Sequence, residues 1–191
     1  MSVRTIGKRS SQAAIFIYKN DGTGEIHWPD VKSIHARQGG IRAEWHVSKE
    51  QFLVSLRAWN RKVDAANSFL CIYAHAGSPG ISCDPEDWKA LVSWSELAAA
   101  LPNPVHYLWL LGCKTRECIR AWAPLHAPVG HLLLATSASK YWGPFIECFE
   151  HEITLNNIGY DDEMPGILRK KYPKLAKHTA YFRAALLKVR S

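Results

Sequence analysis

Two short, strongly apolar runs constrain most what this chain can fold into. They cover residues 68–74 (SFLCIYA) and 105–111 (VHYLWLL). Strands in the middle of a parallel sheet are covered on both faces, so they are apolar throughout instead of alternating with polar residues. Two such strands, separated by helical patterns, predict an α/β fold: a three-layer sandwich whose mostly parallel central sheet is flanked by helices.

Other segments extend this pattern on both sides. Further strands are expected at residues 13–18, 41–47 and 129–136. Residues 41–47 (IRAEWHV) alternate apolar and polar side chains, which predicts a strand with one exposed face. Helices are expected from Ser48, where Gln51 gives capping-box spacing, from Ser93 or Ser95 to Leu101, over residues 115–122, near residues 144–151, and after Pro173.

The length of 191 residues fits one ordinary domain with a short appendage, which we place at residues 1–163 and 164–191. Eight of the 24 lysine and arginine residues lie from Met164 onward, where no Asp or Glu occurs. An apolar stripe through Leu175, Thr179, Phe182, Leu186 and Val189 predicts that this basic segment is a helix packed on, or extending from, the domain. A solvated helix face explains such a charge run better than nucleic acid does, since no aromatic–basic binding motif accompanies it.

The cysteine pattern bears on the compartment. The five cysteines are odd in number and lie in or beside apolar segments, which is typical of a reducing cytosol and not of a disulfide framework. Residues 1–12 are polar and basic, unlike a secretory signal. Residues 121–139 carry no charged side chain but contain two His and two Pro, unlike a membrane span. We therefore expect a cytoplasmic protein without a membrane partner.

Two of the expected strands end in residues that can do chemistry. His75 follows the run at 68–74, and Cys113 follows Gly112 after the run at 105–111. In open parallel sheets, sites collect beyond the carboxyl ends of the strands, and neighbouring strands lie about 5 Å apart. An imidazole near a thiol raises the reactive thiolate fraction, so the pair could act as general base and nucleophile.

The surroundings of Cys113 favour the same chemistry. If a helix starts directly after it, the thiolate faces free backbone N–H groups and the positive end of the helix dipole. Gly112 allows close approach of a substrate backbone, and Gly77 could offer an N–H to a developing oxyanion.

These segments resemble the caspase-like cysteine peptidases, among them the bacterial CHAT-type domains. The resemblance rests on LCIYAHAG, WSELAAAL, VHYLWLLGCKT and VGHLLLATSASKYW, between residues 68 and 151, and on the order His then Cys. It implies peptide-bond hydrolysis without a metal or cofactor, with His75 as base and Cys113 as nucleophile. It further implies an oxyanion hole from the backbone N–H groups of Cys113 and the glycine turn.

The resemblance also implies how substrate and partners are handled. The strand after the nucleophile would wall the specificity pocket, so Ser137, Ser139 and Trp142 become candidate substrate-binding residues. Domains of this kind are often inactive until a regulatory protein binds. This chain departs from the usual pattern in having Ala76 between the His and Gly77, and no glycine soon after Cys113.

The same residues are also compared with the requirements of other functions. An amidotransferase-like hydrolase would pair Cys113 with His151 and Glu152, and an inert caspase-like module would bind a protein or an acidic partner. A cysteine phosphatase needs an Arg six residues after the nucleophile, where this chain has Ile119. No second His/Cys pair shows zinc-ligand spacing, and the glycine pairs do not continue as a nucleotide fingerprint.

Overall fold

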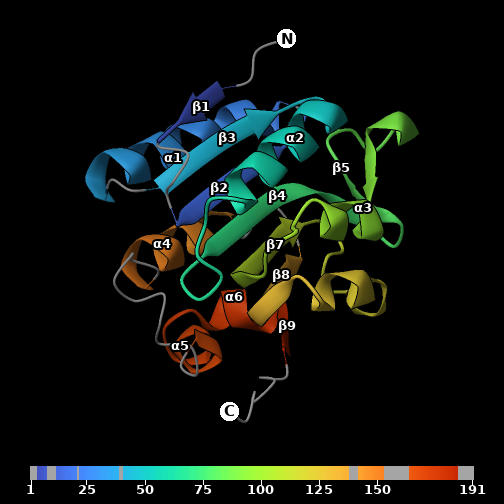
Figure 1. Cartoon of the computed structure of the whole chain (residues 1–191). Helices are drawn as coiled ribbons and strands as arrows, with labels where there is room; N and C mark the ends of the chain where they lie inside the picture. Colours follow the sequence, from blue (N-terminus) through green and yellow to red (C-terminus); the bar gives the residue numbers. More distant parts are fainter. Residues whose placement is uncertain are drawn as a thin grey trace.

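The computed structural model describes residues 4–7, 12–20, 22–38, 41–137, 142–152 and 164–184. Their centre is one sheet in the order β1-β3-β2-β4-β7-β8-β9 (Figure 1). The strands that run parallel are β2 (Ala13–Tyr18), β3 (Ile41–His46), β4 (Phe69–Gly77), β7 (Val105–Gly112) and β8 (Val129–Ser137). The antiparallel strands β1 (Arg4–Ile6) and β9 (Thr179–Arg183) lie at the two ends of this order.

Helices cover both faces of the sheet. One core is built with α1 (Thr23–Gln38), α4 (Trp142–Glu152), α5 (Met164–Lys171) and α6 (Pro173–Lys177). The other is built with α2 (Lys49–Asn60), α3 (Trp94–Ala99) and the 3-10 helix η2 (Ile119–His126). The expected α/β sandwich with a mostly parallel sheet between helical layers is therefore confirmed.

The central strands divide their side chains between these two cores, with one irregularity between Val105 and Tyr107 of β7. On β4, Cys71 and Tyr73 belong to the core under α1 and α4, whereas Ile72 and Ala74 belong to the core under α2 and α3. This alternation is the two-residue period of an extended strand. It fixes which layer each residue near the strand ends faces.

Strand β4 runs further than its sequence indicates. The glycines and proline after Ala74 predict an irregular segment, and this prediction is wrong for residues 75–77. They continue β4 and pair antiparallel with β5 (Gly80–Ser82), which pairs with β6 (Leu91–Ser93) after the short 3-10 helix η1 (Trp88–Ala90). A Cβ atom at Gly80 would lie 2.0 Å from the carbonyl oxygen of Val92, so the glycine allows this tight pairing.

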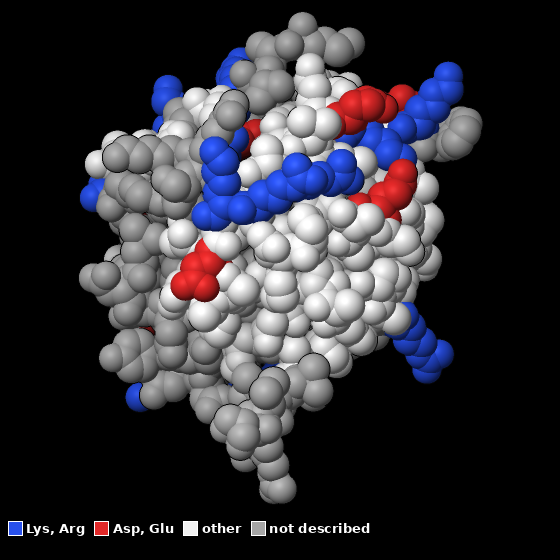
Figure 2. All heavy atoms as spheres, viewed as in Figure 1, with Lys and Arg blue, Asp and Glu red and all other residues white. Residues whose placement is uncertain are grey.

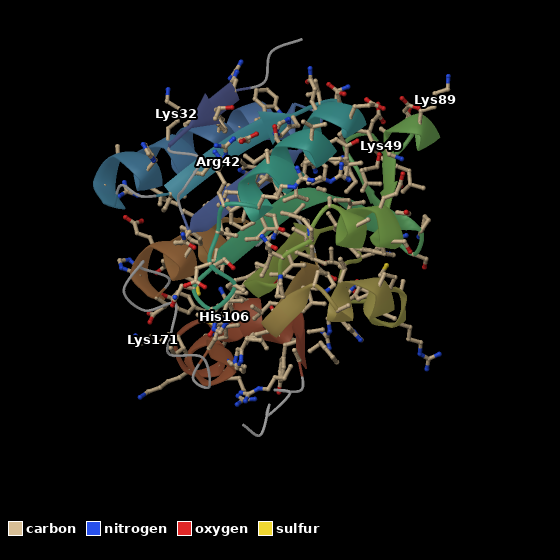
Figure 3. All side chains as sticks on the ribbon, in the orientation of Figure 1. Lys32, Arg42, Lys49, Lys89, His106 and Lys171 are labelled. Atoms are coloured by element: carbon tan, nitrogen blue, oxygen red, sulfur yellow. The ribbon has the colours of Figure 1, made fainter. Side chains whose placement is uncertain are left out.

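The expectation that β3 exposes one face is also wrong, because all its residues are buried. The polar members Arg42, Glu44 and His46 contact one another: Arg42 forms an ion pair with Glu44, and His46 Nε2 lies 2.7 Å from Glu44 Oε2 (Arg42 is labelled in Figure 3). Burial, and then the charge of Arg42, lower the pKa of His46 to about 4. The imidazole is therefore neutral, and Arg42 balances the Glu44 carboxylate.

The helix starts differ in detail from their predictions. Ser93 caps α3 with a complete capping box, accepting from the N–H of Glu96, whose carboxylate accepts from the N–H of Ser93. Ser48 precedes α2 but makes no side-chain cap bond, because its hydroxyl donates to Glu50. The capping box expected at Ser48 is therefore wrong.

The basic C-terminal segment is not one helix. Helix α6 ends at Lys177, and Thr179 to Arg183 form β9, which pairs antiparallel with β8. The helical stripe predicted through Thr179 and Phe182 is therefore wrong, since strand pairing overrides the local periodicity. Leu186, Val189 and the proposed boundary at residue 163 lie outside the described residues.

Figure 2 shows one face, on which acidic and basic side chains lie near one another instead of gathering as a field of one sign. Among the described residues, no helix combines the length and the apolar character needed to cross a bilayer.

Candidate active site

Strand register brings the segments that carry His75 and Cys113 to the same edge of the sheet. In the parallel pair β4–β7 the last partners are Tyr73 and Leu111, and His75 and Cys113 each follow two residues later along the chain. The strands stay in close contact to this point, because a Cβ atom at Gly112 would lie 2.1 Å from the carbonyl oxygen of Ala74. Both residues follow the alternation toward the core under α1 and α4. The expected meeting of the two strand ends is thus present in the backbone.

The end of β4 leaves its edge toward β7 available to the turn after Cys113. Strand β5 pairs with the edge of β4 that faces β2, beyond the end of β2. The hydrogen bond from Asn20 N–H, just after β2, to the Cys83 carbonyl, just after β5, at 2.9 Å indicates this side. On the β7 side, Cys118 shares a side-chain hydrogen bond with Ser78, which directly follows β4. The turn at residues 113–118 and the β4–β5 hairpin therefore lie near each other.

Cys113 is the only exposed cysteine of the five in the chain. Burial is the first cause that raises the pKa of the other four thiols, to about 12 for Cys148. A thiol must be both reachable and ionisable to act as a nucleophile, and buried apolar surroundings make it inert. Of the chain's thiols, Cys113 alone meets the first condition. His75 is half-buried, with its Nε2 atom inside the protein.

The backbone after Cys113 does not form the helix that its sequence predicts. Residues 113–118 are turns, and η2 begins only at Ile119, so the proposed helix dipole at the thiolate is wrong. Instead Lys114 has φ of 59°, in the left-handed region. This conformation costs a residue other than glycine about 1–2 kcal/mol, and strained positions of this kind cluster at functional sites.

Side chains of the turn and of β8 hold this conformation. The Thr115 hydroxyl is 2.6 Å from the Thr136 carbonyl oxygen and 3.1 Å from that of Gly112. Arg116 N–H donates to Ser137 Oγ at 2.9 Å, and the Ser137 hydroxyl donates to Glu117 Oε2 at 2.5 Å. The turn that carries Cys113 is therefore fastened to the end of the neighbouring strand.

The other predicted site residues are distributed unevenly. Ser137 is buried at the end of β8, and its hydroxyl is bonded to two exposed residues of the turn, Arg116 and Glu117. Gly77 is the last residue of β4, whereas Ser139 lies outside the described residues. Trp142 packs on Tyr73 with 4.8 Å between ring centroids, which places it at this edge of the sheet.

A cluster near Trp142 escaped the sequence analysis. The Trp142 indole donates to Asp30 Oδ2 at 2.9 Å. The centroids of the His27 and Trp142 rings are 4.6 Å apart. The buried Lys19 ammonium lies over the Tyr73 ring at 4.8 Å. Their positions in the sequence could have indicated this cluster. Lys19 directly follows the strand at residues 13–18, and residues 27–30 follow the same strand after a turn, so all of them lie near the carboxyl end of that strand.

The alternative base His151 lies at the opposite edge of the sheet. Two residues before it, Phe149 packs on Phe69, the first residue of β4, at 5.2 Å between ring centroids. His106, near the start of β7, marks the same edge in Figure 3. At about 3.3 Å per residue, the length of β7 puts Cys113 roughly 20 Å away. The amidotransferase-like pairing of Cys113 with His151 is therefore wrong.

Among the residues that the structure describes, no three His, Cys, Asp or Glu side chains are grouped to hold an ion.

Comparison with known proteins adds one structural likeness. No family model matches the chain, and no curated protein matches it. Among solved structures it is similar to a secreted C11 cysteine protease from Bacteroides thetaiotaomicron, with a TM-score of 0.48 and 10% sequence identity. The match covers 73% of this chain and 57% of that protease, little more than half its length. Function is therefore inferred from this chain's own side chains.

Proposed function

We propose that this protein is a cysteine hydrolase of caspase-like type that cleaves peptide bonds with Cys113 as nucleophile and His75 as general base. The observation that supports the proposal is the strand register, which brings β4 and β7 together as far as Tyr73 and Leu111, two residues before His75 and Cys113. The exposure of Cys113 and the strained turn beside it support the same assignment.

The proposed reaction has two halves. His75 takes the proton of the Cys113 thiol, and the thiolate attacks the carbonyl carbon of the peptide to form a tetrahedral intermediate. The imidazolium returns that proton to the leaving amine, and an acyl-thioester remains on Cys113. Water, deprotonated by His75, then releases the acid and restores the thiol. Backbone N–H groups of Cys113 and Gly77 are the proposed donors to the oxyanion.

The resemblance in sequence motifs favours a protein or peptide as substrate, Trp142 as part of the pocket wall and a regulatory protein partner. The cysteine pattern favours a cytoplasmic location, where the thiol stays reduced. No cofactor enters the proposed steps.

The test is selective labelling by iodoacetamide. We expect the wild type to be alkylated at Cys113, with the rate falling at acidic pH as the imidazole is protonated. His75→Ala should slow the alkylation of Cys113 by about tenfold or more at neutral pH. His151→Ala is the matched control, since this exposed histidine lies at the other edge of the sheet and should leave the rate unchanged.

Two results would contradict the proposal. Equal alkylation rates in wild type and His75→Ala would show that the imidazole does not assist the thiol, and would favour the inert interaction module. Labelling spread over several cysteines of the folded protein would contradict the exposure of Cys113 alone.

A further inference from the structure

The strained residue beside the proposed nucleophile needs an external support. Lys114 has a left-handed backbone although its side chain is exposed, so no packing of that side chain imposes the conformation. An unsupported turn would relax to a negative φ, because the left-handed region is unfavourable for a side chain with a Cβ atom. Relaxation would rotate the peptide that follows Cys113.

Ser137 supplies part of this support from β8. Its hydroxyl accepts from the backbone N–H of Arg116 at 2.9 Å and donates to the Glu117 carboxylate at 2.5 Å, two and three residues after Lys114. The hydrogen bond from Ser137 is the first cause that lowers the pKa of Glu117. The acceptor is therefore ionised at neutral pH, and such charge-assisted bonds are stronger than neutral ones.

The C-terminal segment fastens the same turn from outside. Arg116 Nη1 donates to the Lys177 carbonyl oxygen at 2.5 Å, and Ser137 N–H donates to that of His178 at 2.9 Å. Thr179 Oγ1 donates to the Leu175 carbonyl oxygen at 2.8 Å and lies 2.7 Å from the hydroxyl oxygen of Thr136. Strand β8 thus lies between the turn and the α6–β9 segment, with polar contacts on both sides.

We propose that Ser137, backed by the α6–β9 segment, is a positioning residue that holds the Cys113 turn in its reactive conformation. This assignment rests on the proposed function and changes the role of Ser137 from substrate contact to support. It makes the basic C-terminal segment part of the active-site framework. Loosening this segment would then lower the reactivity of Cys113 without touching His75 or substrate.

The test combines Ser137→Ala with substitutions that alter the cost of the left-handed turn. Ser137→Ala should slow alkylation of Cys113 by about tenfold and speed amide hydrogen exchange over residues 114–118. Adding Lys114→Asn should recover most of the rate, because Asn accepts the left-handed region more readily. Adding Lys114→Val should not, because a β-branched residue resists it.

A matched control separates positioning from general destabilisation. Ser68→Ala removes another buried hydroxyl that accepts a backbone N–H, that of His106 at 3.1 Å, at the opposite edge of the sheet. It should lower the stability comparably and leave Cys113 reactivity unchanged. If Ser137→Ala does not fold, Thr179→Val removes only the outer hydroxyl and should act in the same direction more weakly.

The outcomes distinguish this inference from the proposed function. Unchanged exchange over residues 114–118 in a folded Ser137→Ala, or in Thr179→Val where Ser137→Ala does not fold, would overturn the positioning role. Equal recovery by Asn and Val at position 114 would also overturn it. Failure of the catalytic proposal would give a different result: His75→Ala would leave the alkylation rate of Cys113 unchanged, while Ser137→Ala would still speed hydrogen exchange over residues 114–118.

Discussion

Gly112 lies where β4 and β7 approach most closely, directly before the proposed nucleophile. In Gly112→Ala the new Cβ atom would be 2.1 Å from the Ala74 carbonyl oxygen, and also 3.4 Å from Thr115 Cγ2. Real Cβ contacts essentially never fall under 3.0 Å, so the strands must separate by about 0.9 Å at this point. The atom in the way belongs to the backbone of a central strand, and it cannot rotate aside.

We expect Gly112→Ala to lower the free energy of unfolding by about 1–3 kcal/mol, the usual cost of overpacking a core. For a chain of this size that corresponds to a fall in the melting temperature of about 2–4 °C per kcal/mol. Urea unfolding followed by tryptophan fluorescence would measure it, with an unchanged slope against denaturant. Alkylation of Cys113 should also slow, because the displaced residue is its chain neighbour.

The matched control is Gly166→Ala in α5, where the new Cβ atom meets nothing within 4 Å. Removing a glycine from a helix interior should stabilise the protein by about 0.5–1 kcal/mol. The reasoning is refuted if Gly112→Ala proves as stable as the wild type, since the close approach of β4 and β7 would then not exist.

Two further predictions concern stability. Ser93→Ala should cost about 1 kcal/mol in urea unfolding because it removes the capping box of α3, whereas Ser48→Ala, which removes no cap bond, should be nearly neutral; equal losses would contradict the assignment. Burial lowers the pKa of His46 to about 4, so the unfolded chain takes up the proton first and stability should fall as the pH drops from about 6.5 toward 4. The loss should approach about 1.4 kcal/mol per pH unit in the wild type and should be missing in His46→Gln. The same fall in stability with pH in both proteins would contradict the assignment.

Some of the fold could be predicted because the signal is local. The run at residues 13–18 forms β2 over the predicted residues, and the runs at 68–74 and 105–111 form β4 and β7 at the centre of the sheet. Such segments are apolar along their whole length because both faces are buried, and this requirement is visible without knowing the neighbours. The placement of His75 and Cys113 at strand ends follows from the same runs.

Other features escaped prediction because their causes lie far away in the chain. The burial of Glu44 depends on charges that face it within β3, and an alternating pattern cannot reveal that such residues neutralise one another. The strand at Thr179 exists because β8, more than 40 residues earlier, offers it a pairing edge. The helix expected after Cys113 gave way to a turn that is bonded to Ser137.

The sequence by itself therefore determined the layers, the central strands and the two residues proposed for the chemistry. Burial of a strand or a helix face requires apolar residues at regular short spacings, and this pattern is visible in the sequence. Only the tertiary structure decided that β4 and β7 pair in register up to the two proposed residues, that His151 lies at the other edge of the sheet, and that the C-terminal segment is hydrogen-bonded to the turn after Cys113. Pairing register and side-chain hydrogen bonds join segments distant along the chain, and no local pattern contains that information.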